Sequence, residues 1–189
     1  MTAEVERSFR DAATRGDLPG CKRTYRLANS ALLSADEQGF TALHCASANN
    51  HVVVVQWLLG LGAELAASSI FGWRPMHEAC YHGCIECARA LHDAGGALDD
   101  ATLVGSTPLH LASFGGHLDL VSWLLEGGAS NSADSDNRDV LHYAAAGGHK
   151  ELSAWLQARL GLQFADSTTR VEHVLALSLA DLGASVRSL

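Results

Sequence analysis

The chain has 189 residues and carries 13 basic against 21 acidic side chains, a formal net charge of −8. Because phosphate binding requires clustered lysines and arginines, this balance argues against a nucleic-acid partner. The longest apolar run, within residues 52–59, is too short to cross a membrane, and the N-terminus is too polar for a signal peptide. The five cysteines are an odd number, which favours reduced thiols in an intracellular protein, cytoplasmic or nuclear.

The first two expected helices occupy residues 4–15 and about 21–31, with a break at residues 16–20 that is rich in glycine and proline. Val5 and Phe9 lie on one side of the first helix, and the second helix is basic. We expect residues 1–35 to form an end unit with one face in solvent.

Four segments follow, each predicted to contain two short helices. Residues 102–133 show the pattern best: Thr107 suits a helix N-cap, and Pro108 suits the first helical position. Gly115-Gly116 and Gly127-Gly128 are placed to end the two helices. Helices this short cannot bury their own apolar faces, so each segment needs similar neighbours. The four segments are residues 36–68, 69–101, 102–133 and 134–161.

One histidine recurs in all four segments at intervals of 33, 33 and 32 residues: His44, His77, His110 and His142. An alanine follows each histidine by two residues and a leucine follows it by fourteen. The stretch from Thr107 to Ala112 reads Thr-Pro-Leu-His-Leu-Ala, and it resembles the signature of the ankyrin repeat, whose period is about 33 residues. The other copies depart from it, since Arg74 replaces the threonine and residues 42 and 140 are not proline.

This resemblance implies an all-α solenoid: helix-turn-helix units joined by short β-hairpin loops, in one domain over residues 1–189. Residues 1–35 then become a degenerate first repeat. Residues 162–189 are predicted to form a truncated capping repeat, because Thr169 and Glu172 have capping-box spacing before an apolar stretch. A free interaction helix is the alternative for that segment. At the turns, Asn50 and Asn137 replace glycines and are expected to adopt a left-handed conformation.

The repeated side chains have both structural and functional interpretations. We expect each turn histidine to bond within its own turn, rather than to belong to a metal or acid–base set, because it recurs with the repeat. Trp57, Trp123 and Trp155 share one position of the second helix and are expected to pack between repeats. A binding stripe on the outer face is the alternative for these rings.

The third repeat offers the sharpest chemical alternative. Cys84 and Cys87 have the C-x-x-C spacing of zinc sites, with Cys80, His77 and His82 nearby. A structural zinc site normally uses a second pair, however, and the chain has no other C-x-x-C. We therefore expect the three cysteines to be packing residues, and we predict no metal and no cofactor.

The resemblance to ankyrin repeats implies that partners contact a concave face, which is built from the hairpin tips and the exposed side of each first helix. Bulky apolar residues lie at the tips of the middle two repeats, where polar residues are usual, and such a patch typically marks an interaction site. Phe71, Trp73, Tyr81 and Phe114 are predicted to anchor a partner, with Tyr81 and Phe114 side by side. The alternative is that the bulky tips pack on one another. The full predicted set is Phe40, Ile70, Phe71, Trp73, Tyr81, His82, Leu103, Val104, Phe114 and Arg138.

We predict from these observations a non-catalytic, monomeric protein-binding module. Its concave face is expected to hold an extended or helical partner segment, basic or apolar in character, and the module is expected to contact neither nucleic acid nor membrane. An adaptor that recruits substrates to a larger assembly fits the same surface. A metal- or thiol-dependent enzyme, or a zinc site, built on the third repeat is the alternative from another functional class.

Overall fold

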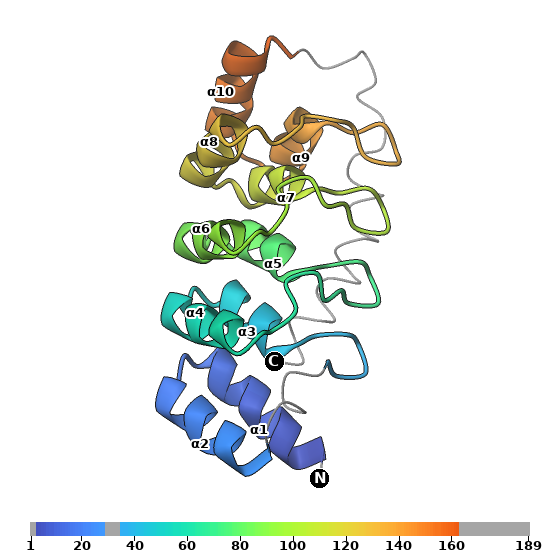
Figure 1. Ribbon diagram of the computed structural model, residues 1–189. Coiled ribbons are helices and arrows are strands. Elements are labelled where there is room, and N and C mark those ends of the chain that lie inside the picture. The colour runs from blue at the N-terminus through green and yellow to red at the C-terminus, as the bar shows by residue number, and fades with distance from the viewer. Residues whose placement is uncertain (1–2, 29–34, 163–189) are drawn as a thin grey trace.

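The computed structural model describes residues 3–28 and 35–162, and within them the chain forms ten helices arranged as five pairs (Figure 1). The predicted capping repeat from residue 163 onward, and the end of the predicted second helix, lie outside the described residues. The helices are α1 (Ala3–Thr14), α2 (Leu18–Ala28), α3 (Ala42–Ala48), α4 (Val52–Gly60), α5 (Pro75–Tyr81), α6 (Ile85–Asp93), α7 (Pro108–Gly115), α8 (Leu118–Glu126), α9 (Val140–Ala146) and α10 (Lys150–Leu160).

The pairs stack in one direction, and each pair contacts its neighbours in the chain. The first helices form an inner row in which α1, α3, α5, α7 and α9 follow one another, and the second helices form an outer row beside it (Figure 1). The loops between pairs fold back as hairpins that all project on the side of the inner row. This arrangement confirms the predicted all-α solenoid.

The helix ends follow the predicted chemistry with one exception. Gly116 ends α7 in the left-handed region, and Asn50 and Asn137 have φ of 55° and 60°, as expected for residues that replace turn glycines. The second helix was predicted to begin near Cys21, but α2 begins at Leu18. Asp17 explains the difference, because its Oδ1 accepts a hydrogen bond from the N–H of Gly20 and caps the helix start.

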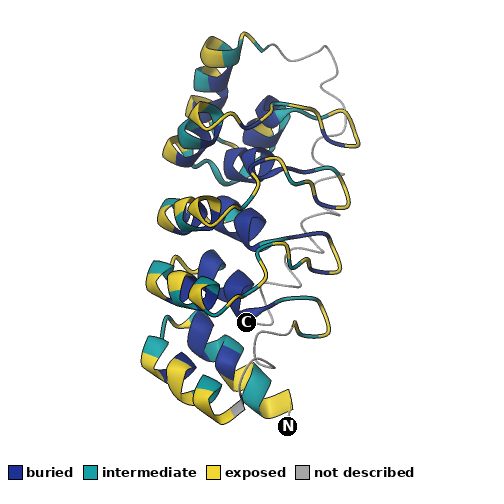
Figure 2. Ribbon diagram, in the orientation of Figure 1, coloured by how far each residue is buried: buried dark blue, intermediate teal, exposed yellow. Residues whose placement is uncertain are grey.

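The core runs through the whole stack between the two helix rows (Figure 2). Its largest fully buried side chains include one leucine from the second helix of each of the four repeats, Leu58, Leu91, Leu124 and Leu156. Buried faces of neighbouring pairs meet directly, so no pair has a core of its own.

Two of the three tryptophans of the outer row, Trp57 and Trp123, pack between pairs, as the sequence predicted. The Trp57 ring lies edge-on to Tyr25 at 5.7 Å and near Phe9 at 6.3 Å, both from the first pair. The Trp123 ring contacts His92 of the preceding repeat at 5.8 Å, in a similar edge-on arrangement. These rings therefore join neighbouring units.

Candidate functional site

The hairpins that precede the inner helices are closed by their own first residues. In the third repeat the N–H of Ser69 bonds to the carbonyl of Trp73 at 2.7 Å, and the Ser69 hydroxyl accepts from the N–H groups of Phe71 and Trp73. The equivalent residues of the other repeats act in the same way as acceptors: Asp36, Thr102 and Asp134. Polar side chains therefore stiffen each tip from within, and the residues at its apex remain free to point outward.

Adjacent hairpin tips are joined by single main-chain hydrogen bonds. The N–H of Ile70 donates to the carbonyl of Gln38 at 2.9 Å, and the N–H of Leu103 donates to Phe71 at 3.2 Å. A third bond, from Ser135 to Val104, continues the series at 3.2 Å. The tips therefore form one continuous row along the stack rather than four independent loops.

The turn histidines anchor each inner helix to its hairpin. In the second repeat the N–H of Thr41 donates to Nδ1 of His44, so the neutral ring carries its proton on Nε2 and donates it to the carbonyl of Trp73 at 3.1 Å. His77 repeats this arrangement with Arg74 and with the carbonyl of Asp100. Burial lowers the pKa of His44 and His77 to about 4, which keeps both rings neutral near pH 7. The predicted structural role is confirmed, and the Nε2 bonds extend it to the following hairpin or linker.

The most exposed part of the predicted surface is the group of four residues Ile70, Phe71, Leu103 and Val104, which we call the tip patch. Ile70 is 57% exposed and Leu103 is 75% exposed, while Phe71 is 38% exposed and Val104 is 47% exposed. The hydrogen bond from Leu103 to Phe71 places the two tips side by side. Four large apolar residues thus meet in one exposed area, as predicted.

Behind the tip patch, three aromatic rings form a second group, which we call the aromatic row: Trp73, Tyr81 and Phe114. Tyr81 and Phe114 stack with their centroids 6.0 Å apart and their planes at 11°, which confirms the prediction that they lie side by side. Trp73, in contrast, was predicted to project from the tip, and this is wrong, because the side chain is only 7% exposed. It turns inward and lies edge-on to Tyr81 at 5.6 Å, so it supports the row instead of contacting solvent.

Arg138 was included in the predicted binding surface, and this too needs correction. Only 12% of its side chain is exposed, and Nη2 makes ion pairs with Asp134 at 2.7 Å and Asp136 at 3.0 Å. The Tyr143 hydroxyl donates to the same Asp134 carboxylate and contacts the Ser106 hydroxyl at 2.6 Å. Arg138 is therefore held in a polar network between the last two hairpins.

The two remaining predicted residues differ in exposure. Phe40 is half-buried and lies edge-on to His44 with centroids 5.4 Å apart, so it supports the turn. His82 is exposed at the end of α5, and its Nε2 lies 3.8 Å from the Glu78 carboxylate. Burial lowers the pKa of His82 from its usual value.

Glu78 is the one residue of this surface that the sequence analysis missed. It lies on α5 beneath Tyr81 and His82, is 8% exposed, and burial raises the pKa of its carboxyl to about 8. A signal was present in the repeat register, because the equivalent positions hold the uncharged residues Cys45, Leu111 and Tyr143. A carboxyl group at a position otherwise occupied by packing residues is unusual, since buried charges are rare without a partner.

The cysteines of the third repeat are free thiols within the helix pair. Cys84 and Cys87 both point their sulfurs at carbonyls of the second repeat, Cys84 at Ala48 (3.5 Å) and Cys87 at Ala46 (4.0 Å). Burial raises the pKa of Cys80, Cys84 and Cys87, which disfavours the thiolate form. Over residues 3–28 and 35–162, the structure brings together no group of three or more His, Cys, Asp or Glu residues suited to a metal ion.

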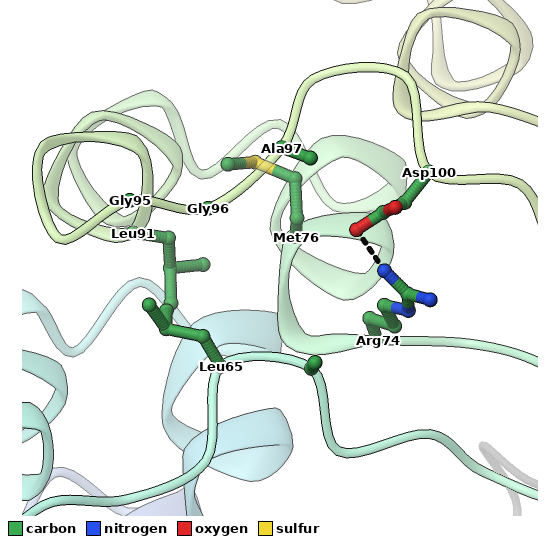
Figure 3. Close-up of a pocket in the computed structure, with 9 residues that line it drawn as sticks. Leu65, Arg74, Met76, Leu91, Gly95, Gly96, Ala97 and Asp100 are labelled. Atoms are coloured by element: carbon green, nitrogen blue, oxygen red, sulfur yellow. Dashed lines mark ion pairs between the residues drawn. The ribbon is translucent and has the colours of Figure 1, made fainter.

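A small pocket of about 110 Å³ opens between the loops that follow α4 and α6 (Figure 3). Leu65, Met76 and Leu91 line its apolar part, and an ion pair between Arg74 and Asp100 lies at one side. Arg74 stands where the other repeats have a capping Thr or Asp, and its pairing with Asp100 ties the start of α5 to the linker that follows α6. The pocket is small compared with the volumes of several hundred Å³ typical of ligand sites.

Comparison with known proteins places this architecture in a family. The family description "Ankyrin repeats (3 copies)" matches residues 10–99 and 93–166. Among curated proteins, the chain is 38% identical over 82 residues to ankyrin repeat and SOCS box protein 2 of Bos taurus, covering 43% of this chain and 13% of the relative. It is 36% identical over 91 residues to ankyrin repeat and SOCS box protein 3 of Homo sapiens, covering 47% of this chain and 18% of the relative.

A third relative is the SMC5-SMC6 complex localization factor protein 1 of Homo sapiens, 39% identical over 93 residues, which are 48% of this chain and 9% of the relative. The chain therefore matches less than a fifth of the length of each of these relatives. No helix among the described residues is long and apolar enough to cross a membrane. With the family match spanning most of the sequence and the helix pairs stacked as described, the chain belongs to the ankyrin-repeat family.

Proposed function

We propose that this chain is a non-catalytic protein-binding module and that the tip patch is the centre of its contact with a partner. The observation that carries the proposal is the exposure of Ile70, Phe71, Leu103 and Val104 in one area of a rigid row of hairpins. Apolar side chains gathered in this way gain free energy when a partner covers them, and hot spots of interfaces are built from such groups. Ankyrin repeats serve as protein-interaction modules, which agrees with this role.

The rest of the surface favours a basic or apolar partner segment. The chain has a net charge of −8, and Arg138 of the last hairpin is already paired with two carboxylates. A basic segment would be attracted over a long range and would associate faster at low salt. We further propose that the protein is a monomer of the cytoplasm or nucleus.

An adaptor role is the more specific form of the proposal. Two of the relatives are named for a SOCS box in addition to their ankyrin repeats, and a third is named for localising a complex. Names of this kind suit chains in which the repeats bind one protein while another surface connects it to an assembly. We propose such a two-surface role for this chain.

The test compares the wild-type chain with the double variant Leu103→Ser, Val104→Ser in affinity capture from cell extract. Because both side chains are exposed, the variant should melt at the wild-type temperature, while capture through the tip patch should weaken by about 2 kcal/mol, or roughly 30-fold. The control variant Val53→Ser, Leu118→Ser removes two exposed apolar side chains from the outer helices α4 and α8.

Each outcome has a meaning for the proposal. Loss of every captured protein supports a single binding surface, and loss of one set with retention of another supports the adaptor role. Capture by the tip-patch variant equal to that of the wild type would show that the partner binds elsewhere. Equal losses in both variants would show that the effect belongs to surface hydrophobicity in general.

A further inference from the structure

Glu78 lies in the inner helix row, and among the described residues the one charged group that approaches its carboxylate is His82. Its side chain projects from α5 and is largely buried, yet in the described part of the chain no hydrogen-bond donor reaches its carboxylate. The nearest nitrogen is Nε2 of His82 at 3.8 Å, beyond hydrogen-bonding distance. Burying a carboxyl group without a partner costs free energy, so a group in this position is poised to gain from a ligand that supplies the missing donor.

Tyr81 is close to this carboxyl group, because burial and then the charge of Glu78 raise the pKa of the Tyr81 hydroxyl. Tyr81 follows Glu78 by three residues on α5, so the two side chains lie on neighbouring parts of one helix face. The Tyr81 ring stacks on Phe114 of the next repeat and is supported from the side by Trp73. Both Tyr81 and Phe114 are partly exposed, and the face of an aromatic ring attracts cations.

We propose that Glu78, Tyr81 and Phe114 form a subsite for a positively charged side chain, lysine or arginine, of the bound partner. This inference rests on the proposed protein-binding function, because the tip patch would hold the apolar part of the same segment. The carboxylate would supply the counter-charge and hydrogen-bond acceptor, and the stacked rings would contact the methylene stem and the cationic end. Neither group alone would be selective, but together they favour a cation over an apolar side chain of equal length.

The electrostatics of the surroundings support this assignment. Burial favours the neutral form of Glu78, so an incoming cation would ionise the carboxyl group and release a proton. The titratable groups around it are Cys45 of α3, Cys84 at the start of α6, and Tyr81 and His82 of its own helix, while His117 after α7 lies near His82. None of these supplies a lysine or arginine. Cation affinity should therefore increase as pH rises from 6 to 9.

The test uses two small probes on the full chain, N-acetyl-lysine methylamide and N-acetyl-norleucine methylamide, which differ in the terminal ammonium group. Binding is followed by NMR through the carboxyl carbon of Glu78 and the ring signals of Tyr81 and Phe114. We expect the lysine probe to bind at least 10-fold more tightly than the norleucine probe and to lower the titration midpoint of Glu78. An arginine analogue should behave like the lysine probe. Equal binding of the lysine and norleucine probes would overturn the subsite.

Two variants separate this subsite from the tip patch. Glu78→Gln keeps the shape of the side chain and should lose the preference for the lysine probe, whereas Leu103→Ser, Val104→Ser should retain it. If Glu78→Gln binds the lysine probe as tightly as the wild type, the subsite is wrong and the tip patch is unaffected. If the tip-patch variant captures partners normally while the probes behave as expected, the proposed contact centre is wrong and the cation subsite holds. Should Glu78→Gln fail to fold, the comparison of the lysine and norleucine probes on the wild-type chain still tests the subsite.

Discussion

At the scale of single residues, the turns within the repeats show a coupling between two positions in neighbouring units. A second set of histidines bonds through Nε2 to a carbonyl at the end of the preceding inner helix, at 2.9–3.0 Å: His51, His117 and His149. In the third repeat Cys84 occupies the same position. Each of these rings covers a glycine with positive φ, and a Cβ at Gly16 or Gly83 would lie 2.5 Å from the imidazole. Where Cys84 replaces the ring, the glycine is replaced as well, by Asn50.

This coupling predicts that Cys84→His destabilises the fold by about 1–3 kcal/mol, because the larger ring would meet the Cβ of Asn50. The double variant Asn50→Gly, Cys84→His recreates the pair found at the other turns and should recover most of that loss. Chemical denaturation of the wild type, both single variants and the double variant measures the coupling energy.

The reverse double-mutant cycle, made at the next turn, is the control for this prediction. Gly83→Asn should destabilise the chain because His117 covers that glycine, and His117→Cys should relieve the clash. Strictly additive free energies in both cycles would show that the two positions are independent.

A second residue-scale prediction concerns Glu78 and the pH dependence of stability. Its pKa rises from 4.5 to about 8 on folding, so the folded state holds its proton more tightly than the unfolded state. Stability from this group is complete below about pH 4.5 and falls as pH rises toward 8. Glu78→Gln has no such proton, so its free energy of unfolding should exceed that of the wild type by a few kcal/mol at pH 8. This advantage in stability should disappear at pH 4.5. Urea unfolding at several pH values measures the difference, and a constant difference across that range would contradict the assigned environment.

At the scale of elements, the hairpin row depends on close approach between successive tips. Gly72 has φ of 82°, and a Cβ there would lie 2.6 Å from the backbone nitrogen of Leu103, which is the donor of the bond between the two tips. The glycine therefore serves both the turn and the junction with the next hairpin.

We predict that Gly72→Ala weakens the junction between the third and fourth hairpins. The positive φ alone costs an alanine roughly 1 kcal/mol, and the contact with Leu103 adds to that cost. Gly62→Ala is the matched control, since Gly62 has φ of 84° with no atom near its missing Cβ. Denaturant unfolding should show a larger loss for Gly72→Ala, with faster hydrogen exchange at the Leu103 amide. Equal losses of stability in the two variants would show that the contact between a Cβ at position 72 and Leu103 adds no cost.

The helices and the core were predictable from the sequence because each signal is repeated, so that deviations such as Arg74 or Asn50 could be placed by register. The orientation of Trp73 was not predictable in this way. Its equivalents are Phe40, which is half-buried, Ser106, which is buried, and Arg138, which is largely buried. Serine and arginine are usually solvent-exposed, so these two residues conceal the inward direction that Phe40 alone would have indicated. Glu78 was missed although the repeat register places it among uncharged residues, because a glutamate on a helix is usually solvent-exposed and its burial arises from the packing of α5 against its neighbours.

At the scale of the whole molecule, stability is shared between neighbours. Each inner helix contacts the inner helices before and after it, and the tips and the two histidine sets also join only adjacent units. In such a stack the end units have one interface instead of two. A lost contact at an end should therefore open that end without unfolding the middle, where the tip patch lies.

This organisation predicts a local response to Phe9→Ala. Phe9 is fully buried in α1 and packs against Trp57 of the next unit, so its removal leaves a cavity at the first interface and costs roughly 3–5 kcal/mol there. Amide hydrogen exchange measured by mass spectrometry should become faster in α1 and α2 and remain close to wild type in α7 and α8. Leu124→Ala, which creates a cavity in the fourth repeat, is the comparison, and it should raise exchange on both sides of α8. If Phe9→Ala accelerated exchange equally throughout residues 35–162, the stack would unfold as a single cooperative unit, and the tip patch would depend on the first helix pair for its order.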